Sequence, residues 1–98
     1  MPDLTGKQKR FLRSLGNGIK STVFVGHNGI SESVISAAED AFNTTELIKV
    51  RLQEGFTGDR NEAGHELAGK MGAVAVQILG KTILLFKPSA ENPEIKLP

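Results

Sequence analysis

Two kinds of hydrophobic periodicity alternate along this chain of 98 residues, and their order limits the folds that it can adopt. Stretches with apolar residues every three or four positions predict helices, whereas stretches rich in β-branched residues or with strict alternation predict strands. The predicted order is helix–strand–helix–strand–helix–strand–strand. The helices are expected at about 7–16, 32–43 and 60–71, and the strands at 21–25, 47–52, 73–79 and 82–86.

This order is typical of an α/β domain, and the chain has the length of one domain. Strands that are separated by helices favour a mainly parallel sheet. The last two strands flank Gly80-Lys81, a two-residue turn of the kind that joins antiparallel neighbours. We therefore expect a compact four-stranded mixed sheet with three helices, which lie on one face or are split between both. This domain is expected to span 1–88, followed by a loose tail over 89–98.

Short motifs predict where the helices begin and end. Thr5 and Gln8 form a capping box, and Ser31 is the expected N-cap of the second helix. The first helix is expected to end at 16–18, where glycine can supply a left-handed cap. The third helix is expected to be the weakest, because each interior glycine costs up to about 1 kcal/mol relative to alanine. Its glycines are Gly64, Gly69 and Gly72.

Aromatic residues are few, since the chain has five phenylalanines and neither tryptophan nor tyrosine. Phe11, Phe24 and Phe42 all fall at positions that we assign to the core. A platform of aromatic side chains for base stacking is therefore not expected. Any nucleic acid would be bound mainly through its phosphates and its shape, with a marked dependence on salt.

The absence of cysteine excludes disulfides and thiolate metal sites. The first 30 residues contain no apolar run typical of a signal peptide, and no segment approaches the length of a membrane span. A cytoplasmic protein without a membrane partner is therefore expected.

Motifs typical of enzymes are incomplete in this chain. Gly80-Lys81-Thr82 resembles the end of a phosphate-binding P-loop, but Ala75 stands where that motif has its first glycine. His65-Glu66 lacks the second histidine of a zinc-protease helix, because Gly69 stands there. The sequence therefore predicts no catalytic residue, no metal site, no cofactor and no small-molecule substrate.

The net charge is only +1, but the charges are unevenly distributed. The balance is +4 over the first 30 residues, −5 over the next 36 and +2 over the last 32. On the first helix, the cations fall on the side opposite an apolar arc of Phe11, Leu12 and Leu15. A basic face of this kind attracts phosphate, although a simple solvated helix face has the same pattern. The cations are Lys7, Lys9, Arg10 and Arg13.

A G-x-x-G motif, Gly26-His27-Asn28-Gly29, separates the first predicted strand from the second helix. Glycines let the backbone approach a ligand closely, and the free N–H groups of a helix N-terminus favour a phosphate. KH domains clamp a nucleotide backbone with a loop of this pattern. The pattern also occurs at 55–58 and 69–72, so an ordinary strand-to-helix turn stays an alternative. We expect the loop and the basic helix face to form a joint RNA-binding surface.

Four segments of the chain, in order and at matching spacing, resemble the YhbY-like family. This family is the stand-alone bacterial form of the chloroplast RNA splicing and ribosome maturation (CRM) domain. The segments are LTGKQKR at 4–10, VGHNGI at 25–30, ELIKV at 46–50 and VQILGKT at 76–82. The resemblance covers about 4–88 and implies a fold similar to the C-terminal domain of translation initiation factor 3. It also implies a non-catalytic protein that binds ribosomal RNA during assembly of the large ribosomal subunit.

The implied RNA-binding residues are those of the loop, the basic helix face and the nearby cations. They are Lys7, Lys9, Arg10, Arg13, Lys20, Gly26, His27, Asn28, Gly29, Lys49, Arg51, Lys81 and Lys87. Phe86-Lys87 replaces the tyrosine and arginine of many relatives, which removes a hydroxyl group and a bidentate guanidinium. The alternative is a protein-interaction module that docks on a ribosomal protein or an assembly factor.

Overall fold

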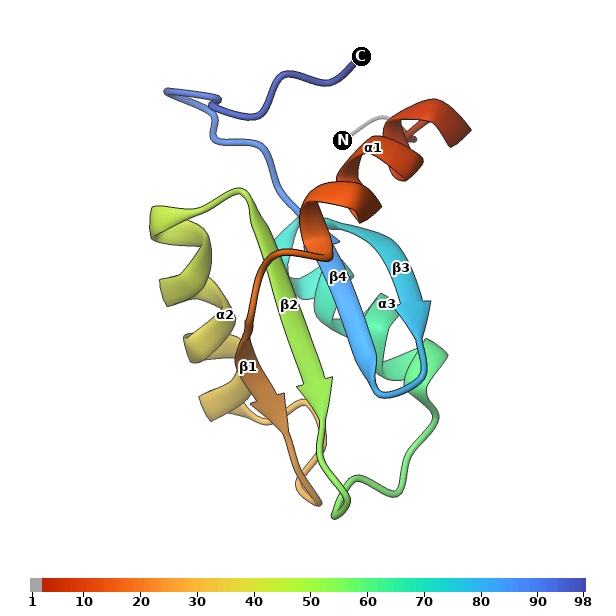
Figure 1. Ribbon diagram of the computed structural model, residues 1–98. Helices are drawn as coiled ribbons and strands as arrows, with labels where there is room; N and C mark the ends of the chain where they lie inside the picture. The colour runs from red at the N-terminus through yellow and green to blue at the C-terminus, as the bar shows by residue number, and fades with distance from the viewer. Residues whose placement is uncertain (1–2) are drawn as a thin grey trace.

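The computed structural model describes residues 3–98 and has three helices and four strands in the predicted order (Figure 1). Each element lies within about two residues of its expected bounds. The helices are α1 (Gly6–Gly16), α2 (Glu32–Thr44) and α3 (Arg60–Met71), and the strands are β1 (Ser21–Val25), β2 (Leu47–Leu52), β3 (Val74–Leu79) and β4 (Thr82–Phe86). None of the helices in this part of the chain is long and apolar enough to cross a membrane.

The sheet has the strand order β1-β2-β4-β3. Strands β1 and β2 are parallel, whereas β4 is antiparallel to both of its neighbours. The mixed four-stranded sheet is confirmed, but the expectation of a mainly parallel sheet is wrong. The reason is that the hairpin folds back so that β4, whose last four residues are all buried, pairs with β2 in the centre of the sheet.

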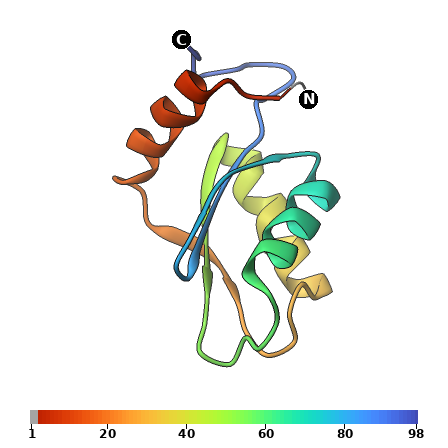
Figure 2. The ribbon, with the colours of Figure 1, turned by 90° about the vertical axis from the view of Figure 1, so that its right-hand side faces the viewer.

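The helices are split between the two faces of the sheet (Figure 2). Helices α2 and α3 cover the face that we call the inner face, and α1 packs on the opposite, outer face. The inner core contains Val23, Val25 and Ile83, and a second core under α1 contains Leu12 and Leu84. Because successive residues of a strand point to opposite faces, the same strands supply both cores.

The ends of α1 differ in how well the sequence predicted them. The capping box is confirmed, since Thr5 Oγ1 accepts a hydrogen bond from Gln8 N at 3.1 Å and Gln8 Oε1 accepts one from Thr5 N at 3.0 Å. The left-handed glycine cap is wrong, because the C-cap is Asn17 in the right-handed helical region. Gly16 is instead a close-packing residue: a Cβ atom there would lie 2.8 Å from Leu84 Cδ2.

The tail after β4 has no helix or strand, but it is not loose. The buried carboxylate of Glu46, which precedes β2, accepts hydrogen bonds from the backbone N–H groups of Ser89, Glu94 and Ile95 at 2.5, 2.8 and 2.7 Å. Ile95 also packs against the core under α1, as does Leu97. Burial raises the pKa of the Glu46 carboxyl, but these three hydrogen bonds outweigh it and hold the pKa below its ordinary value.

Candidate nucleic-acid interface

The outer face of the sheet is only half covered. Helix α1 lies over the end at which β2 begins and β4 ends, where Leu47 and Phe86 join its core. We call this the α1 end of the sheet, and the opposite end, where β1 and β2 run into loops, the loop end. Among residues 3–98, no helix lies over the outer face at the loop end (Figures 1 and 2).

Strand pairing brings four residues of this uncovered surface into one row. Phe24 of β1 pairs with Arg51 of β2, Arg51 pairs with Thr82 of β4, and Thr82 pairs with Leu79 of β3. Since all four alternate with inner-core residues, their side chains share the outer face. We call this surface the open row: Phe24, Arg51, Thr82 and Leu79.

The position of Phe24 overturns its assignment to the core. Its side chain is 48% exposed, while its neighbours Val23 and Val25 are completely buried. The alternation within S-T-V-F-V was a sufficient signal, because Phe24 lies at the position opposite to two valines. Phe11 and Phe42 are partly buried and pack against the cores as expected.

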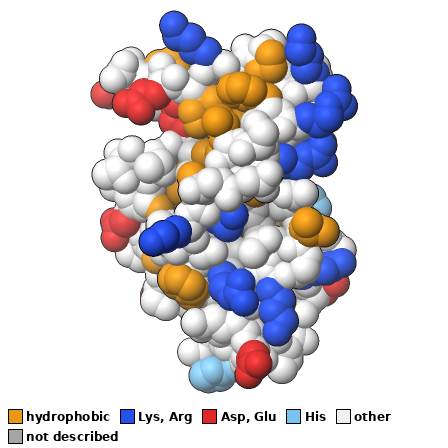
Figure 3. All heavy atoms as spheres, viewed as in Figure 1, with side chains coloured by type: hydrophobic (Ala, Val, Ile, Leu, Met, Phe, Trp, Pro, Cys, Tyr) orange, Lys and Arg blue, Asp and Glu red, His pale blue; other side chains and the backbone are white. Residues whose placement is uncertain are grey.

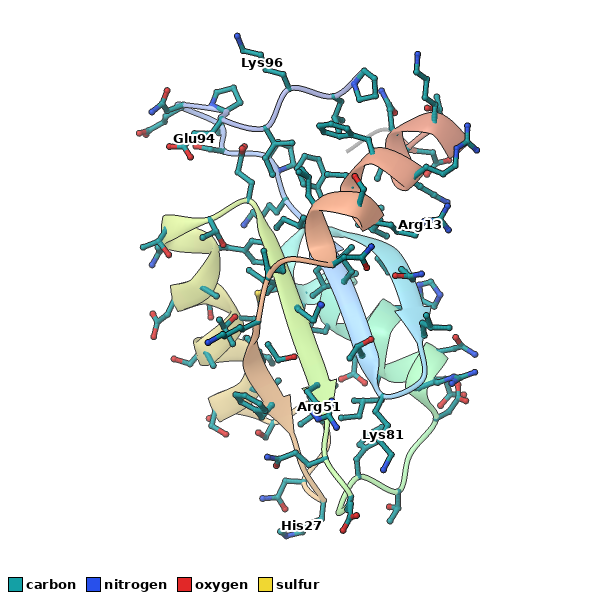
Figure 4. The ribbon with its side chains drawn as sticks, in the orientation of Figure 1. Arg13, His27, Arg51, Lys81, Glu94 and Lys96 are labelled. Atoms are coloured by element: carbon teal, nitrogen blue, oxygen red, sulfur yellow. The ribbon has the colours of Figure 1, made fainter. Side chains whose placement is uncertain are left out.

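Several of the predicted RNA-binding cations lie on or beside this surface. Arg51 and Lys81 both lie toward the loop end, and Figure 4 shows their side chains near one another. Lys49 lies two residues before Arg51 on the same face and is half-buried, and Lys20 is exposed immediately before β1. Figure 3 shows Lys and Arg side chains gathered along this face and along α1.

The cations of α1 are not equally exposed. Lys7 and Arg10 are exposed, whereas Lys9 and Arg13 are half-buried at the flanks of the helix. Leu15, expected on the buried arc, is 39% exposed, because Leu12 and Gly16 are the α1 residues that are buried. The helix is therefore rotated relative to the predicted arc, and its basic face turns partly toward the sheet.

The G-x-x-G motif forms a tight turn at the loop end. Gly29 N donates to Gly26 O at 3.1 Å, and Gly29 has a φ of 65°, which favours glycine. The side chains of His27 and Asn28 are exposed, and Ser31 caps α2 by accepting from Val34 N at 3.4 Å. The loop therefore presents two polar side chains beside a helix N-terminus, as predicted from its sequence.

A second loop lies against the first and brings acidic residues to this end. A Cβ atom on Gly55 would be 3.4 Å from His27 N, and Gln53 N donates to Val25 O at 2.8 Å. This second loop carries Glu54, and Glu32 opens α2; both are exposed. The G-x-x-G loop is consequently bordered by carboxylates, which weaken its attraction for phosphate unless cations lie near.

The expected joint surface of the loop and α1 needs a correction. The two lie at opposite ends of the sheet: in Figure 4, His27 is at one end and Arg13 at the other. What connects them is the open half of the outer face, with Lys49 and Arg51. Lys87 does not belong to this surface, because its Nζ lies 6.0 Å from the centroid of the Phe42 ring of α2.

One further cation was missed by the sequence reasoning. Arg60, the first residue of α3, donates from Nη1 to the carbonyl oxygen of Gly80 at 3.2 Å. It thereby braces the turn that presents Lys81. Gly80 has a φ of 59° and Lys81 has no positive φ, as the predicted type II′ turn requires.

The two histidines, His27 and His65, are both exposed and come from different elements. Within residues 3–98, no group of three His, Asp or Glu side chains is arranged to hold a metal ion.

Comparisons with known proteins extend over almost the whole chain. A family model described as the CRS1 / YhbY (CRM) domain matches residues 4–87. The probable RNA-binding protein YqeI of Bacillus subtilis is 39% identical over 95 residues, which are 97% of this chain and 99% of that protein. An RNA-binding protein of Haemophilus influenzae is 34% identical over 98 residues, 100% of this chain and 98% of its relative. The solution structure of a hypothetical protein from Staphylococcus aureus is similar, with a TM-score of 0.83 and 38% identity over 98% of this chain and 100% of that one.

Proposed function

Because the chain belongs to the CRS1/YhbY (CRM) domain family, we propose that it is a non-catalytic RNA-binding protein. The contact surface in this proposal is the open half of the outer face, with the G-x-x-G loop at one end and α1 at the other. Ribosomal RNA in a precursor of the large subunit is the proposed ligand.

The observation that carries this proposal is the continuity of positive charge along the outer face. Arg51 and Lys81 lie between the loop and α1, and the four strands contain no acidic residue. A polyanion laid along this face therefore meets cations from the loop end to the α1 end, whereas either end alone offers a small site. Arginine contributes most to such a site, since its planar group matches phosphate oxygens in a bidentate way.

Salt-dependent binding tests the proposal directly. Fluorescence anisotropy with structured ribosomal RNA fragments is expected to show an affinity that falls steeply as salt increases, because bound cations release counterions. Replacing Arg51 and Lys81 with alanine is expected to weaken binding and to lower the slope of log K against log salt by about 0.7–0.9 for each lost phosphate contact. Lys9→Ala with Arg13→Ala tests the α1 end in the same way.

The matched control removes the same charge from elsewhere. Lys70 on α3 and Lys87 after β4 are exposed and lie outside the proposed surface, so K70A/K87A is expected to bind nearly as well as the original protein. If the Arg51/Lys81 double variant and this control lose affinity equally, the effect comes from net charge and the proposed surface is wrong. Absence of binding at low salt would remove the RNA-binding function itself.

The ribosomal part of the proposal needs its own experiment. Crosslinking in cells, followed by sequencing of the bound RNA, is expected to enrich large-subunit ribosomal RNA over transfer and messenger RNA. Pull-downs with and without nuclease distinguish the protein-interaction alternative, because a direct contact with a ribosomal protein survives removal of the RNA.

A further inference from the structure

Deepening the proposed function on which it rests, we infer that Phe24 is a stacking platform for one unpaired base of a single-stranded RNA. Arg51, beside it in the sheet, contacts the phosphate of the same or the adjacent nucleotide. The protein would then read exposed bases as well as phosphates, in contrast to what the scarcity of aromatic residues predicts.

The first support is that this ring is exposed although its burial would stabilise the protein. Burying a phenylalanine contributes about 1.5–3 kcal/mol relative to leaving it in water. Phe24 lies on β1, an edge strand, and α1 makes its main contacts with β2, β3 and β4. The exposed half of this side chain is therefore accessible to a ligand that approaches along the outer face.

The second support is the composition of the open row. Arg51 is the direct neighbour of Phe24 in the parallel register, and adjacent strands lie about 4.8 Å apart. Thr82 and Leu79 continue the row across the sheet. An aromatic ring next to a guanidinium combines the two contacts that single-stranded nucleic acid uses, stacking of the base and pairing with its phosphate.

The third support is the closeness of the G-x-x-G loop. Gly26 follows Phe24 by two residues, which is about 6.6 Å along an extended strand. If the RNA backbone is bound at the loop, a neighbouring base of the same strand therefore lies close enough to reach Phe24. The positive charge of Arg51 also offsets the repulsion between the phosphate and the carboxylates of Glu32 and Glu54 beside the loop.

The charges beside Phe24 and Leu79 favour RNA over a protein as the ligand of this surface. Phe24 and Leu79 are two of the three exposed large hydrophobic residues in the described chain, and an exposed apolar pair also suits a protein partner. A second copy of this chain would, however, bring Arg51 and Lys49 against like charges. An acidic protein segment can also pair with Arg51, but single-stranded RNA carries both an anion and a ring that can stack in every nucleotide.

The lack of tryptophan and tyrosine makes the test unusually direct. Phe24→Trp introduces a single tryptophan, whose emission is quenched when a base stacks on it. The probe is a mixed-sequence RNA of 12 nucleotides, used alone and annealed to its complement. Quenching is expected with the single strand and not with the duplex. Leu79→Trp, about three strand spacings or 14 Å away on the same row, is the matched reporter and is expected to be quenched much less.

Affinity gives the second readout. Phe24→Leu keeps an apolar side chain and removes the ring, and it is expected to weaken binding of the single strand by roughly 5- to 150-fold. Phe24→Trp is expected to bind as tightly as the original protein or more tightly. Circular dichroism checks that each variant is folded.

The outcomes separate this inference from the proposed function. If the original protein binds neither these probes nor the structured ribosomal RNA fragments at low salt, the proposed function fails. If it binds the structured fragments but not the single strand, only the stacking inference is overturned. If it binds RNA, but Phe24→Leu binds equally well and the emission of the Phe24→Trp variant is not quenched, only the stacking inference is overturned. Equal quenching at positions 24 and 79 overturns it as well. The inference is also overturned if sedimentation shows a dimer that Phe24→Leu dissociates, because Phe24 then contacts a second copy of this chain.

Discussion

The two faces of the sheet are built from the same four strands but differ in how completely they are covered. On the inner face, Val25, Ile83 and Leu85 are fully buried under α2 and α3. On the outer face at the loop end, Phe24 and Leu79 remain exposed beside Arg51. Since strand residues alternate between faces, residues of the inner core and residues of the proposed RNA-binding surface occupy alternate positions of one strand. A substitution on one face can therefore be tested against its neighbour on the other.

The largest contrast is expected from one chemical change made on the two faces. Leu67 of α3 is fully buried in the inner core, whereas Leu79 of the open row is 63% exposed. Leu67→Ala is expected to lower the free energy of unfolding by about 2–5 kcal/mol through lost burial and the cavity left behind. Leu79→Ala is expected to change it by about 0.5 kcal/mol or less. Urea denaturation measures both.

A large loss of stability for Leu79→Ala would contradict this contrast between the faces. It would mean that the outer face at the loop end contributes to folding as the inner face does. The open row would then stabilise the fold, and its exposure would not by itself indicate a binding surface for RNA.

The next effect concerns the covered end of the outer face, where Glu46 holds the tail. Glu46→Gln keeps one acceptor oxygen but turns an amide group toward a backbone N–H, so at least one of the three hydrogen bonds is lost. Because hydrogen bonds to a charged group contribute about 1.5–3 kcal/mol, a loss of that order is expected at neutral pH. Hydrogen exchange of the amides of Ser89, Glu94 and Ile95 is expected to accelerate. Glu91→Gln, an exposed tail residue, is the control and is expected to leave both measurements unchanged.

The same carboxylate predicts how stability depends on pH. The pKa of Glu46 is lower in the folded protein than in the unfolded chain, so its contribution is present above the unfolded value of about 4.3. It is lost as the pH falls through the lower folded pKa. The difference in stability between the original protein and Glu46→Gln is therefore expected to be full at pH 7 and to shrink toward pH 3. A difference that stays constant over this range would contradict the tail contact as the cause.

The sequence was sufficient for features that depend on neighbours in the chain. The capping box of Thr5, the cap at Ser31 and the hairpin at Gly80-Lys81 are local patterns, and all were predicted within a residue or two. The insertion of β4 between β2 and β3 was not, because it depends on which hydrophobic strand pairs best in the centre of the sheet. The tail contact was missed for a similar reason: one carboxylate meets amides 43 to 49 residues away, and no periodicity records that.

The candidate interface shows the same division. The residues of the G-x-x-G turn and the cations of α1 could be named from the sequence, but not their separation to opposite ends of the sheet. Lys87 was grouped with Arg51, since nothing in the sequence indicates that its side chain turns to Phe42. Phe24 could have been placed on the outer face from alternation alone. Its hydrophobicity predicts burial, whereas its position in the strand predicts exposure, and the position is correct.

The smallest expected effects come from two glycines in the layer that covers the inner face. Gly69 lies in α3 without a positive φ, whereas Gly72 is the C-cap with a φ of 65°; a Cβ on either would meet nothing within 4 Å. Gly69→Ala is therefore expected to stabilise the protein by about 0.5–1 kcal/mol through helix propensity. Gly72→Ala is expected to destabilise it by about 1–2 kcal/mol through left-handed strain. Thermal unfolding is expected to show a higher midpoint temperature for Gly69→Ala and a lower one for Gly72→Ala.

These two variants also test whether the two faces of the sheet act independently. Helix α3 lies on the inner face, away from Arg51 and Phe24, so both proteins are expected to bind RNA with the original affinity at temperatures where they are folded. A change in affinity that follows the change in stability would show that α3 and the outer face are coupled through the sheet. Unchanged affinity, with stability moving in both directions, is the result expected if the inner face serves folding and the outer face serves binding.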